Sequence, residues 1–266
     1  MNSDGESSAP ALTPSVQLGF PRFFEIAGNS VNSYKVFLAV GICVGTVVTA
    51  VMADLSGLSP LRAGSAAMAS ALAGVIGARV YHVLVHAQAY FTSGPRRALW
   101  DRAAGGLSVF GALLTFVPVS FAAAALFGIP AGALFDDMGV GVLVGGFCIR
   151  LGCVFNGCCV GRETDAPFGV LLHDAKGVMR RRIPVQFLEM AWWLLGLAGY
   201  IGLWPKEFPT GSLALAVLAW YSAGRFVLEP LREEPDIVCG RVRVNQLVAA
   251  VLVVGAAGGL IALLST

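Results

Sequence analysis

The chain has 266 residues, of which 56% are hydrophobic and 13% are charged. Soluble domains carry roughly 45–50% apolar and about 25% charged residues, so this composition excludes an ordinary soluble protein. A net charge of +2, without a basic tail, also argues against nucleic acid as a partner.

The first segment, residues 1–33, contains serine, proline, glycine and scattered charges, which predict a mostly disordered tail. It lacks the basic start, apolar middle and small-residue cleavage site of a signal peptide. The aromatic residues at Phe20–Phe24 favour the membrane interface. These features predict a tail at 1–33, followed by one membrane domain at 34–266.

Seven apolar segments follow, and a helix needs about 20 apolar residues to cross a bilayer. The fourth is short and ends in polar residues, so we expect it to break before the far interface. Gly74–Ala78 and Gly141–Gly145 place small residues four apart, a spacing that favours close helix packing. No internal repeat is visible, which gives an inverted-repeat transporter no support. We predict an all-α, polytopic membrane protein with about seven transmembrane helices, at Tyr34–Ala53, Leu61–His86, Gly105–Ile129, Gly139–Phe155, Pro184–Trp204, Gly211–Leu228 and Val244–Leu264.

Basic residues gather on alternate connections between these segments. The positive-inside rule would put the side that carries them, and the amino terminus with it, in the cytoplasm. The other side carries only Arg62 and Lys206. The basic side holds Arg22, Arg96, Arg97, Arg102, Arg162, Lys176, Arg180, Arg181, Arg182, Arg232, Arg241 and Arg243.

Ionisable residues within or beside the spans are few, and each is a candidate functional residue because a charge in a membrane is costly. Arg225 and Glu229 are four apart and share a helical face. Either they form an ion pair that neutralises both charges, or Glu229 orients Arg225 toward a substrate phosphate. Arg150 has no opposite charge close in sequence, and a guanidinium binds phosphate bidentately. Arg79 either snorkels to the interface or belongs to a site. The set is Lys35, Arg79, Arg150, Glu189, Arg225 and Glu229.

The six cysteines offer a second, weaker signal. Cys148, Cys153 and Cys158 are five apart, a spacing that does not stack them on one helical face. The adjacent pair Cys158 and Cys159 lacks the two-residue gap usual in zinc sites. Buried, inert thiols are the more common case, although a zinc or redox site stays open as an alternative.

Six motifs in order resemble those of the prolipoprotein diacylglyceryl transferase family, over about residues 30 to 264. The signature in the fourth segment, which in the family reads Arg-Ile-Gly-Asn-Phe-Ile-Asn-Gly-Glu-x-x-Gly-Arg, is the longest of them. The six matching stretches are Tyr34; Gly77-Ala-Arg79; Gly105-Gly-Leu-Ser108-Val-Phe-Gly111; Arg150-Leu-Gly-Cys-Val-Phe-Asn156-Gly-Cys-Cys-Val-Gly161-Arg162; Pro184-Val-Gln186-Phe-Leu-Glu189; and Gly224-Arg225-Phe-Val-Leu-Glu229 with Arg232 and Pro235-Asp236.

The resemblance implies an integral enzyme of the bacterial inner (plasma) membrane, with helices around a lipid-binding cavity. It would transfer diacylglycerol from phosphatidylglycerol to the lipobox cysteine thiol of a prolipoprotein, releasing glycerol phosphate. It implies no metal and no organic cofactor. It also implies catalytic roles for Arg150, Arg225 and Glu229, and substrate-binding roles for Tyr34, Arg79, Gly106, Asn156, Gly161, Arg162 and Glu189.

Three positions depart from the family pattern: Phe110 replaces a histidine, Cys153 an asparagine and Cys158 a glutamate. A phenylalanine cannot accept a proton, so the base for the acceptor thiol would be Glu229, a cysteine thiolate or the leaving phosphate. The alternatives to the transferase are a catalytically silent lipid-binding protein of the same fold and a membrane thiol-redox or metal protein. The family places its amino terminus and long loops outside the cytoplasm, against the charge count, and we follow the family because arginines at an anionic-lipid site bias that count.

Overall fold

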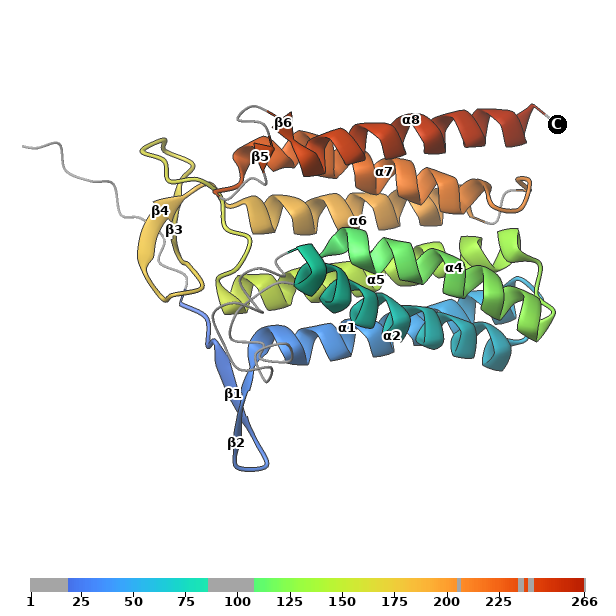
Figure 1. Cartoon of the computed structure of the whole chain (residues 1–266), viewed down its shortest axis with the longest axis horizontal. Coiled ribbons are helices and arrows are strands. Elements are labelled where there is room, and N and C mark those ends of the chain that lie inside the picture. Colours follow the sequence, from blue (N-terminus) through green and yellow to red (C-terminus); the bar gives the residue numbers. More distant parts are fainter. Residues whose placement is uncertain (1–18, 86–107, 205–206, 234–236, 239–241, 266) are drawn as a thin grey trace, which may run out of the picture.

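A computed structural model describes residues 19–85, 108–204, 207–233, 237–238 and 242–265. Within them the chain forms seven α-helices, one short 3₁₀ helix and three two-stranded hairpins (Figure 1). The helices are α1 (Ser33–Leu55), α2 (Pro60–Val85), α4 (Val109–Phe127), α5 (Ala131–Asn156), α6 (Val185–Leu203), α7 (Ser212–Leu228) and α8 (Val244–Leu264). The short elements are β1 (Phe23–Ile26), β2 (Asn29–Asn32), β3 (Val170–His173), β4 (Met179–Arg182), η3 (Glu229–Leu231), β5 (Ile237–Val238) and β6 (Val242–Arg243).

The helices confirm the prediction of an all-α polytopic membrane protein. Among the described residues α1, α2, α5 and α8 are each long and apolar enough to cross a membrane. Large apolar side chains on their outer surfaces are exposed, such as Leu61 at 79% and Val254 at 73%. Exposed apolar surface on this scale marks a face that contacts lipid.

The fourth span differs from the sequence prediction. It begins at Ala131, eight residues earlier than expected, and α5 then runs unbroken to Asn156, so the predicted break is wrong. The added turns contain Asp136 and Asp137, and carboxylates are costly in a membrane unless they are bonded. Both are bonded: Asp136 accepts from the N–H groups of Gly211 (2.6 Å) and Ala214 (2.7 Å) at the start of α7, and Asp137 accepts from Ser56 (2.9 Å).

Close glycine contacts join α1 to α5. A Cβ on Gly145 would lie 2.7 Å from the carbonyl oxygen of Gly41, and one on Gly45 would lie 2.7 Å from that of Gly141. These distances exclude any side chain larger than hydrogen without movement of the helices. The helix packing predicted for the Gly141–Gly145 step is confirmed.

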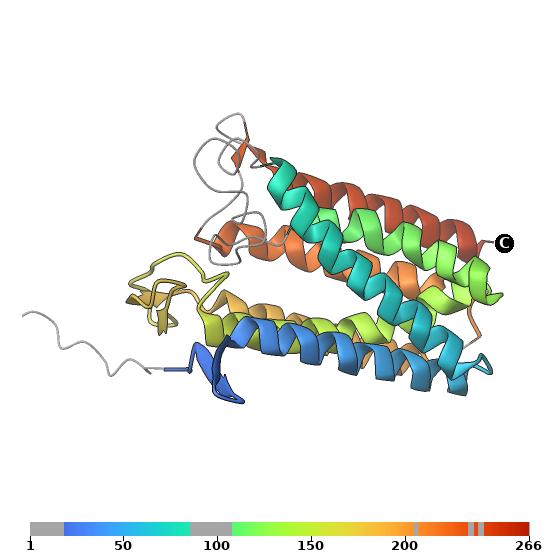
Figure 2. The ribbon, with the colours of Figure 1, turned by 60° about the horizontal axis from the view of Figure 1, so that its bottom comes forward.

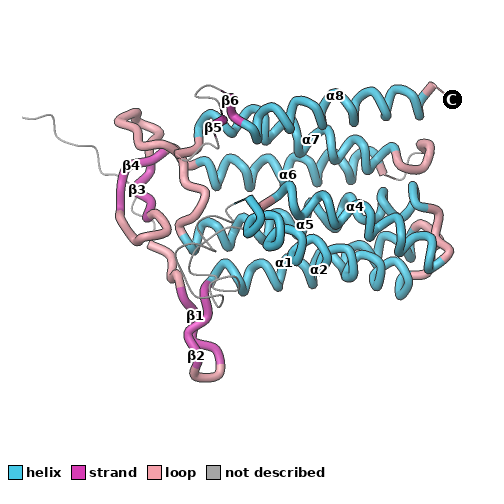
Figure 3. Tube along the Cα trace, viewed as in Figure 1, coloured by secondary structure: helices cyan, strands magenta, loops and turns pink. Residues whose placement is uncertain are grey.

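The three hairpins lie at one end of the bundle, and the carboxyl terminus lies at the other (Figures 1 and 3). Figure 2 shows α2 leaving the end of α1 and running obliquely across the bundle. The β1–β2 hairpin occupies the last part of the predicted tail, while residues 1–18 lie outside the described part. The tail and domain boundaries, and the orientation in the membrane, stay predictions.

The β3–β4 hairpin is fastened by one buried arginine. Arg182, 1% exposed, pairs with Asp174 (3.6 Å) and with Glu233 (2.5 Å). The Asp174 carboxylate also accepts from the N–H groups of Lys176 (2.8 Å) and Val178 (3.0 Å). Burial opposes ionisation of Asp174, but these hydrogen bonds and the Arg182 charge hold its pKa below the ordinary value. The Lys176–Arg182 loop is therefore an ordered structure.

Candidate active site

Three arginines converge on one buried glutamate near the hairpin end. Glu189 of α6, whose side chain is 5% exposed, contacts Arg150 of α5 at 3.1 Å, Arg225 of α7 at 3.2 Å and Arg232 at 3.3 Å. The arginine side chains are only 12–14% exposed. The sequence prediction named Arg150, Arg225 and Glu189, and the structure brings all three together.

Glu229 completes this cluster from the other side of Arg225. It is 1% exposed, contacts Arg225 at 2.7 Å and accepts from the side-chain amide of Asn245 at 2.9 Å. Pro230 follows it, and α7 ends because a proline cannot continue the helical hydrogen bonding. The predicted i,i+4 pair is confirmed, and the turn after it carries Arg232 back to Glu189.

The cluster carries an unbalanced charge. Its three guanidiniums face two carboxylates, Glu189 and Glu229, which leaves one positive charge in excess. A nearly buried charge is costly unless it is paired. The arrangement therefore suits an anionic group, and guanidinium geometry suits a phosphate.

A pair of tryptophans fixes the spacing of α6 and α7 beside the cluster. Trp192 and Trp220 stack at 4.4 Å, and each indole N–H donates to the other's backbone carbonyl at 2.9 Å. Because these residues lie within five positions of Glu189 and Arg225, their packing holds that ion pair in register.

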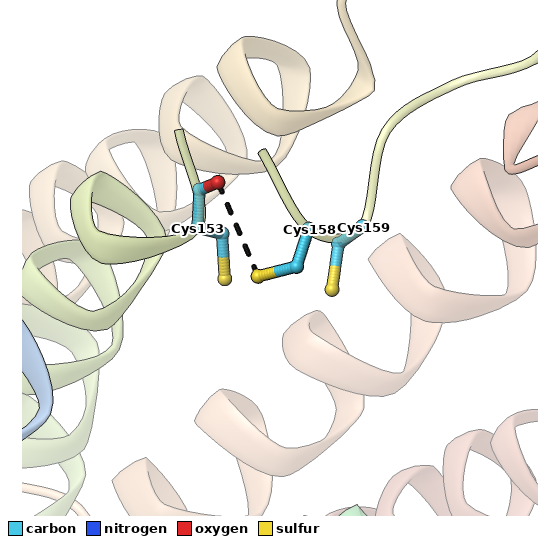
Figure 4. A group of neighbouring side chains, drawn as sticks. All are labelled: Cys153, Cys158 and Cys159. Atoms are coloured by element: carbon cyan, nitrogen blue, oxygen red, sulfur yellow. Dashed lines mark hydrogen bonds between the residues drawn. The ribbon is translucent and has the colours of Figure 1, made fainter. Parts of the chain in front are cut away.

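The signature loop turns three cysteines toward one another (Figure 4), and one of them, Cys153, contacts Arg150. Helix α5 ends at Asn156, and Gly157 has a left-handed φ of 73°, which reverses the chain. The sulfur atoms of Cys153, Cys158 and Cys159 then lie within 4.8 Å of one another. Helical spacing alone did not indicate this group, because two of its members follow the end of the helix.

This loop is held from several sides. The buried Gln186 amide donates to the carbonyls of Cys153 (3.1 Å) and Cys158 (2.7 Å). Arg150 Nη1 lies 3.8 Å from Cys153 Sγ, so the cysteines and the arginine cluster form one continuous site. Hydrogen bonds from the thiols of Cys153 and Cys158, with the charges of Arg232 and Arg150, lower the pKa of Cys159.

Two more predicted residues lie beside this loop. Asn156 accepts from the side chain of Asn32 at 2.7 Å, and Asn32 caps α1 by accepting from the N–H of Tyr34 at 3.0 Å. A Cβ on Gly152 would lie 3.3 Å from the Cα of Tyr34, so Tyr34 packs against the turn of α5 that carries Cys153. Both residues therefore border the site.

Gly161 and Arg162 connect the loop to the cluster mainly through their backbones. Gly161 forms an antiparallel bridge with Arg232, and a Cβ there would overlap the carbonyl oxygen of Ile183. The Arg162 N–H donates to Leu231 (2.9 Å), while its side chain is exposed. The glycine is thus required for the close approach to Ile183, and its backbone bridge positions Arg232.

The remaining positions that the sequence analysis singled out are Arg79, Gly106 and Phe110. Arg79 is half-buried near the end of α2, and its role stays a prediction. Gly106 lies outside the described residues, and for Phe110 only the backbone, at the start of α4, is described.

The prediction of site residues missed Arg232, Gln186 and Asn245, although the first two stand within the quoted motifs. Arg232 could have been found from its position just after the proline that ends α7, which keeps it close to Arg225 and Glu229. Asn245 lies in the first turn of α8, remote in sequence, and nothing near it indicated a partner for Glu229.

Comparison with known proteins identifies a family. The model of the prolipoprotein diacylglyceryl transferase family matches residues 21–262. The chain is similar to proteins called phosphatidylglycerol–prolipoprotein diacylglyceryl transferase in three bacteria. It is 29% identical to that of Corynebacterium diphtheriae over 88% of each chain, and 28% identical to that of Cutibacterium acnes over 95% of this chain and 89% of the relative. The Frankia alni protein is 30% identical over 85% of this chain and 61% of the relative.

Proposed function

Because the chain belongs to the prolipoprotein diacylglyceryl transferase family, we propose that it transfers a diacylglyceryl group from phosphatidylglycerol to a prolipoprotein cysteine thiol. The relatives' names specify the donor and the acceptor protein, and we extend the acceptor to the lipobox peptide around that cysteine. The bacterial sources of the relatives and the apolar helices support the inner membrane as its location.

The convergence of Arg150, Arg225 and Arg232 on Glu189 is the observation that carries the proposal. In the reaction a sulfur–carbon bond forms at the glycerol carbon, and the carbon–oxygen bond to the phosphate breaks. Glycerol phosphate leaves with that electron pair, so negative charge grows on a phosphate oxygen. Preorganised guanidiniums in a nearly dry site stabilise such charge, typically by about 3–4 kcal/mol for each donor.

The contacts suggest distinct roles within the cluster. We assign Arg150 and Arg225 to the phosphate, as the family resemblance implies, and each retains donors beyond the one bonded to Glu189. Glu229 is 1% exposed and bonded on both sides, so it acts by orienting Arg225 rather than by taking a proton. Glu189 holds the three arginines together. The lining of the acyl-chain cavity, with Tyr34, Arg79, Gly106, Asn156 and Arg162 as substrate contacts, stays part of the proposal.

The test is transfer of labelled diacylglycerol from phosphatidylglycerol to a synthetic lipobox peptide by the purified protein. We expect transfer by the wild type, and a loss of at least about 100-fold in Arg150→Ala and in Arg225→Ala. Arg62→Ala is the matched control, because Arg62 lies at the opposite end of the bundle and contacts only a backbone carbonyl among the described residues. Folded wild-type protein that retains lipid but transfers none would overturn the proposal in favour of a lipid-binding role.

A further inference from the structure

The three cysteines of the signature loop form a group that the arginine chemistry does not use. Cys153 is in the last turn of α5, and Cys158 and Cys159 follow the reversal at Gly157 (Figure 4). All three thiols are free, and their sulfurs lie within 4.8 Å of one another. Cys153 is buried, and the other two are half-buried.

The backbone is specifically shaped to bring these sulfurs together. Cys159 has a left-handed φ of 60°, a conformation that is uncommon for residues other than glycine. Such conformations persist where the surrounding structure enforces them, and they concentrate at functional sites. Gln186 fixes the carbonyls on both sides of the turn, and the Gly161–Arg232 bridge fixes the chain just beyond it.

Three converging thiols have a definite ligand chemistry. Thiolates select soft or borderline cations such as Zn²⁺ and Cu⁺ over hard cations. A tetrahedral zinc site has bonds of about 2.3 Å and therefore sulfurs about 3.8 Å apart. The three sulfurs need to approach by at most about 1 Å to reach that geometry.

The surroundings resemble those of a metal site with an open position. Three protein ligands leave the fourth tetrahedral position of zinc for water or substrate. Arg150 Nη1, 3.8 Å from Cys153 Sγ, donates to one ligand, as second-sphere groups do at metal sites. The same arginine contacts Glu189, so a ligand in the fourth position would lie beside the residues assigned to the phosphate.

The geometry points to a zinc site formed by Cys153, Cys158 and Cys159, whose fourth position binds the thiol of the acceptor cysteine. The second half of this inference rests on the proposed function. Zinc would then activate the acceptor thiol in a chain that has Phe110 where the family pattern has a histidine. The site would serve the alkylation of sulfur by positioning the nucleophile next to the leaving phosphate.

The step balances without a redox partner. The acceptor thiol binds through sulfur and releases its proton to solvent, because metal ligands of this type bind as thiolates. The sulfur lone pair then forms the bond to the glycerol carbon while the carbon–oxygen bond breaks, and glycerol phosphate leaves with the electron pair. Zinc stays divalent, and the thioether product is a weaker ligand that dissociates.

The first experiment measures metal binding without lipid or acceptor. Full-length protein is purified under reducing conditions, stripped with a chelator and loaded with Zn²⁺, or with Co²⁺ as a spectroscopic probe. We expect one equivalent of Zn²⁺ and the intense visible bands of tetrahedral, thiolate-bound Co²⁺. Cys159→Ser and Cys153→Ser should weaken binding by more than about 100-fold. Cys148→Ser is the matched control, because Cys148 lies in the same helix outside the group.

Absence of bound Zn²⁺ with all three thiols reactive would overturn the site. A disulfide within the group that persists under reducing conditions, or binding of Cu⁺ alone, would overturn it as well. Equal binding by Cys159→Ser and the wild type would show that the metal lies elsewhere.

The second experiment tests the acceptor. Titration of the Co²⁺ protein with a lipobox peptide should shift the thiolate-to-cobalt bands, whereas the same peptide with serine for cysteine should not. Chelation should abolish transfer, and Zn²⁺ should restore it. If transfer fails with Zn²⁺ bound and the peptide shift present, the proposed function fails and the site stands. If transfer survives full chelation, the acceptor role fails and the transferase stands.

Discussion

Glu189→Gln tests whether one carboxylate holds the arginine cluster together. The three contacts at 3.1–3.3 Å are each worth about 5 kcal/mol by Coulomb's law at an effective dielectric constant near 20. Repulsion among the guanidiniums and the cost of burial offset most of this attraction. Removing one partner of a buried pair costs about 3–5 kcal/mol, so we expect the free energy of unfolding to fall by that amount. The cluster's excess charge would rise from one to two.

The measurement is the free energy of unfolding in detergent micelles, followed by tryptophan fluorescence during a denaturant titration. Glu163→Gln is the matched control, since Glu163 is 47% exposed and pairs with Arg180 at 2.6 Å; its contact with the buried Arg182, at 3.9 Å, is longer than those of Asp174 and Glu233 with the same arginine. Exposed pairs contribute about 0–1 kcal/mol, so this variant should stay near the wild type. The reasoning is refuted if the two variants lose the same stability. Phosphatidylglycerol should also stabilise Glu189→Gln more than it stabilises the wild type.

Gly145→Ala should lower the free energy of unfolding by about 1–3 kcal/mol, because its Cβ would lie 2.7 Å from the Gly41 carbonyl. Gly199→Ala in α6, where nothing lies within 4 Å of the new Cβ, should show no loss, and equal losses would contradict the packing argument. Folding lowers the pKa of Asp174, so its carboxylate stabilises the folded chain at any pH above the pKa that it has in the unfolded chain. This stabilisation is lost as the pH falls through the lower pKa that it has in the folded chain. The protection factors of the amides in the β3–β4 turn, which are corrected for the intrinsic pH dependence of exchange, should therefore fall below about pH 4, and Asp174→Asn should remove that fall.

Most helix bounds could be predicted from the sequence, because each apolar run is long and the thickness of the bilayer sets its length. Val244–Leu264 has the predicted bounds, and α6 and α7 differ from theirs by one residue at each changed end. The start of α5 was misplaced because the partners of Asp136 and Asp137 lie on α7 and beside α1, far away in sequence. Tertiary contacts of this kind leave no local pattern.

In the site, too, contacts within one helix could be predicted from the sequence, and contacts between helices could not. Arg225 and Glu229 share a helical turn, so their pairing followed from spacing. The meeting of Arg150 with Glu189 depends on how α5 packs against α6, which no spacing within either helix reveals. The cysteine group depends on a chain reversal just past a helix end. A run of Gly157 and two cysteines predicts a turn, but not which sulfur atoms the turn brings together.

The aspartate contacts at the far end of α5 also determine how the bundle can move. Asp136 binds the start of α7, its carbonyl accepts from Tyr200 of α6 at 2.9 Å, and Asp137 binds Ser56 after α1. A tilt of α5 that keeps these contacts pivots about that end. Fourteen residues separate Asp136 from Arg150, or about 21 Å at 1.5 Å per residue, so a tilt of roughly 3° displaces the arginine by about 1 Å. For a lipid bound near the hairpins, a tilt of this size about the far end therefore suffices to loosen or tighten the arginines around it.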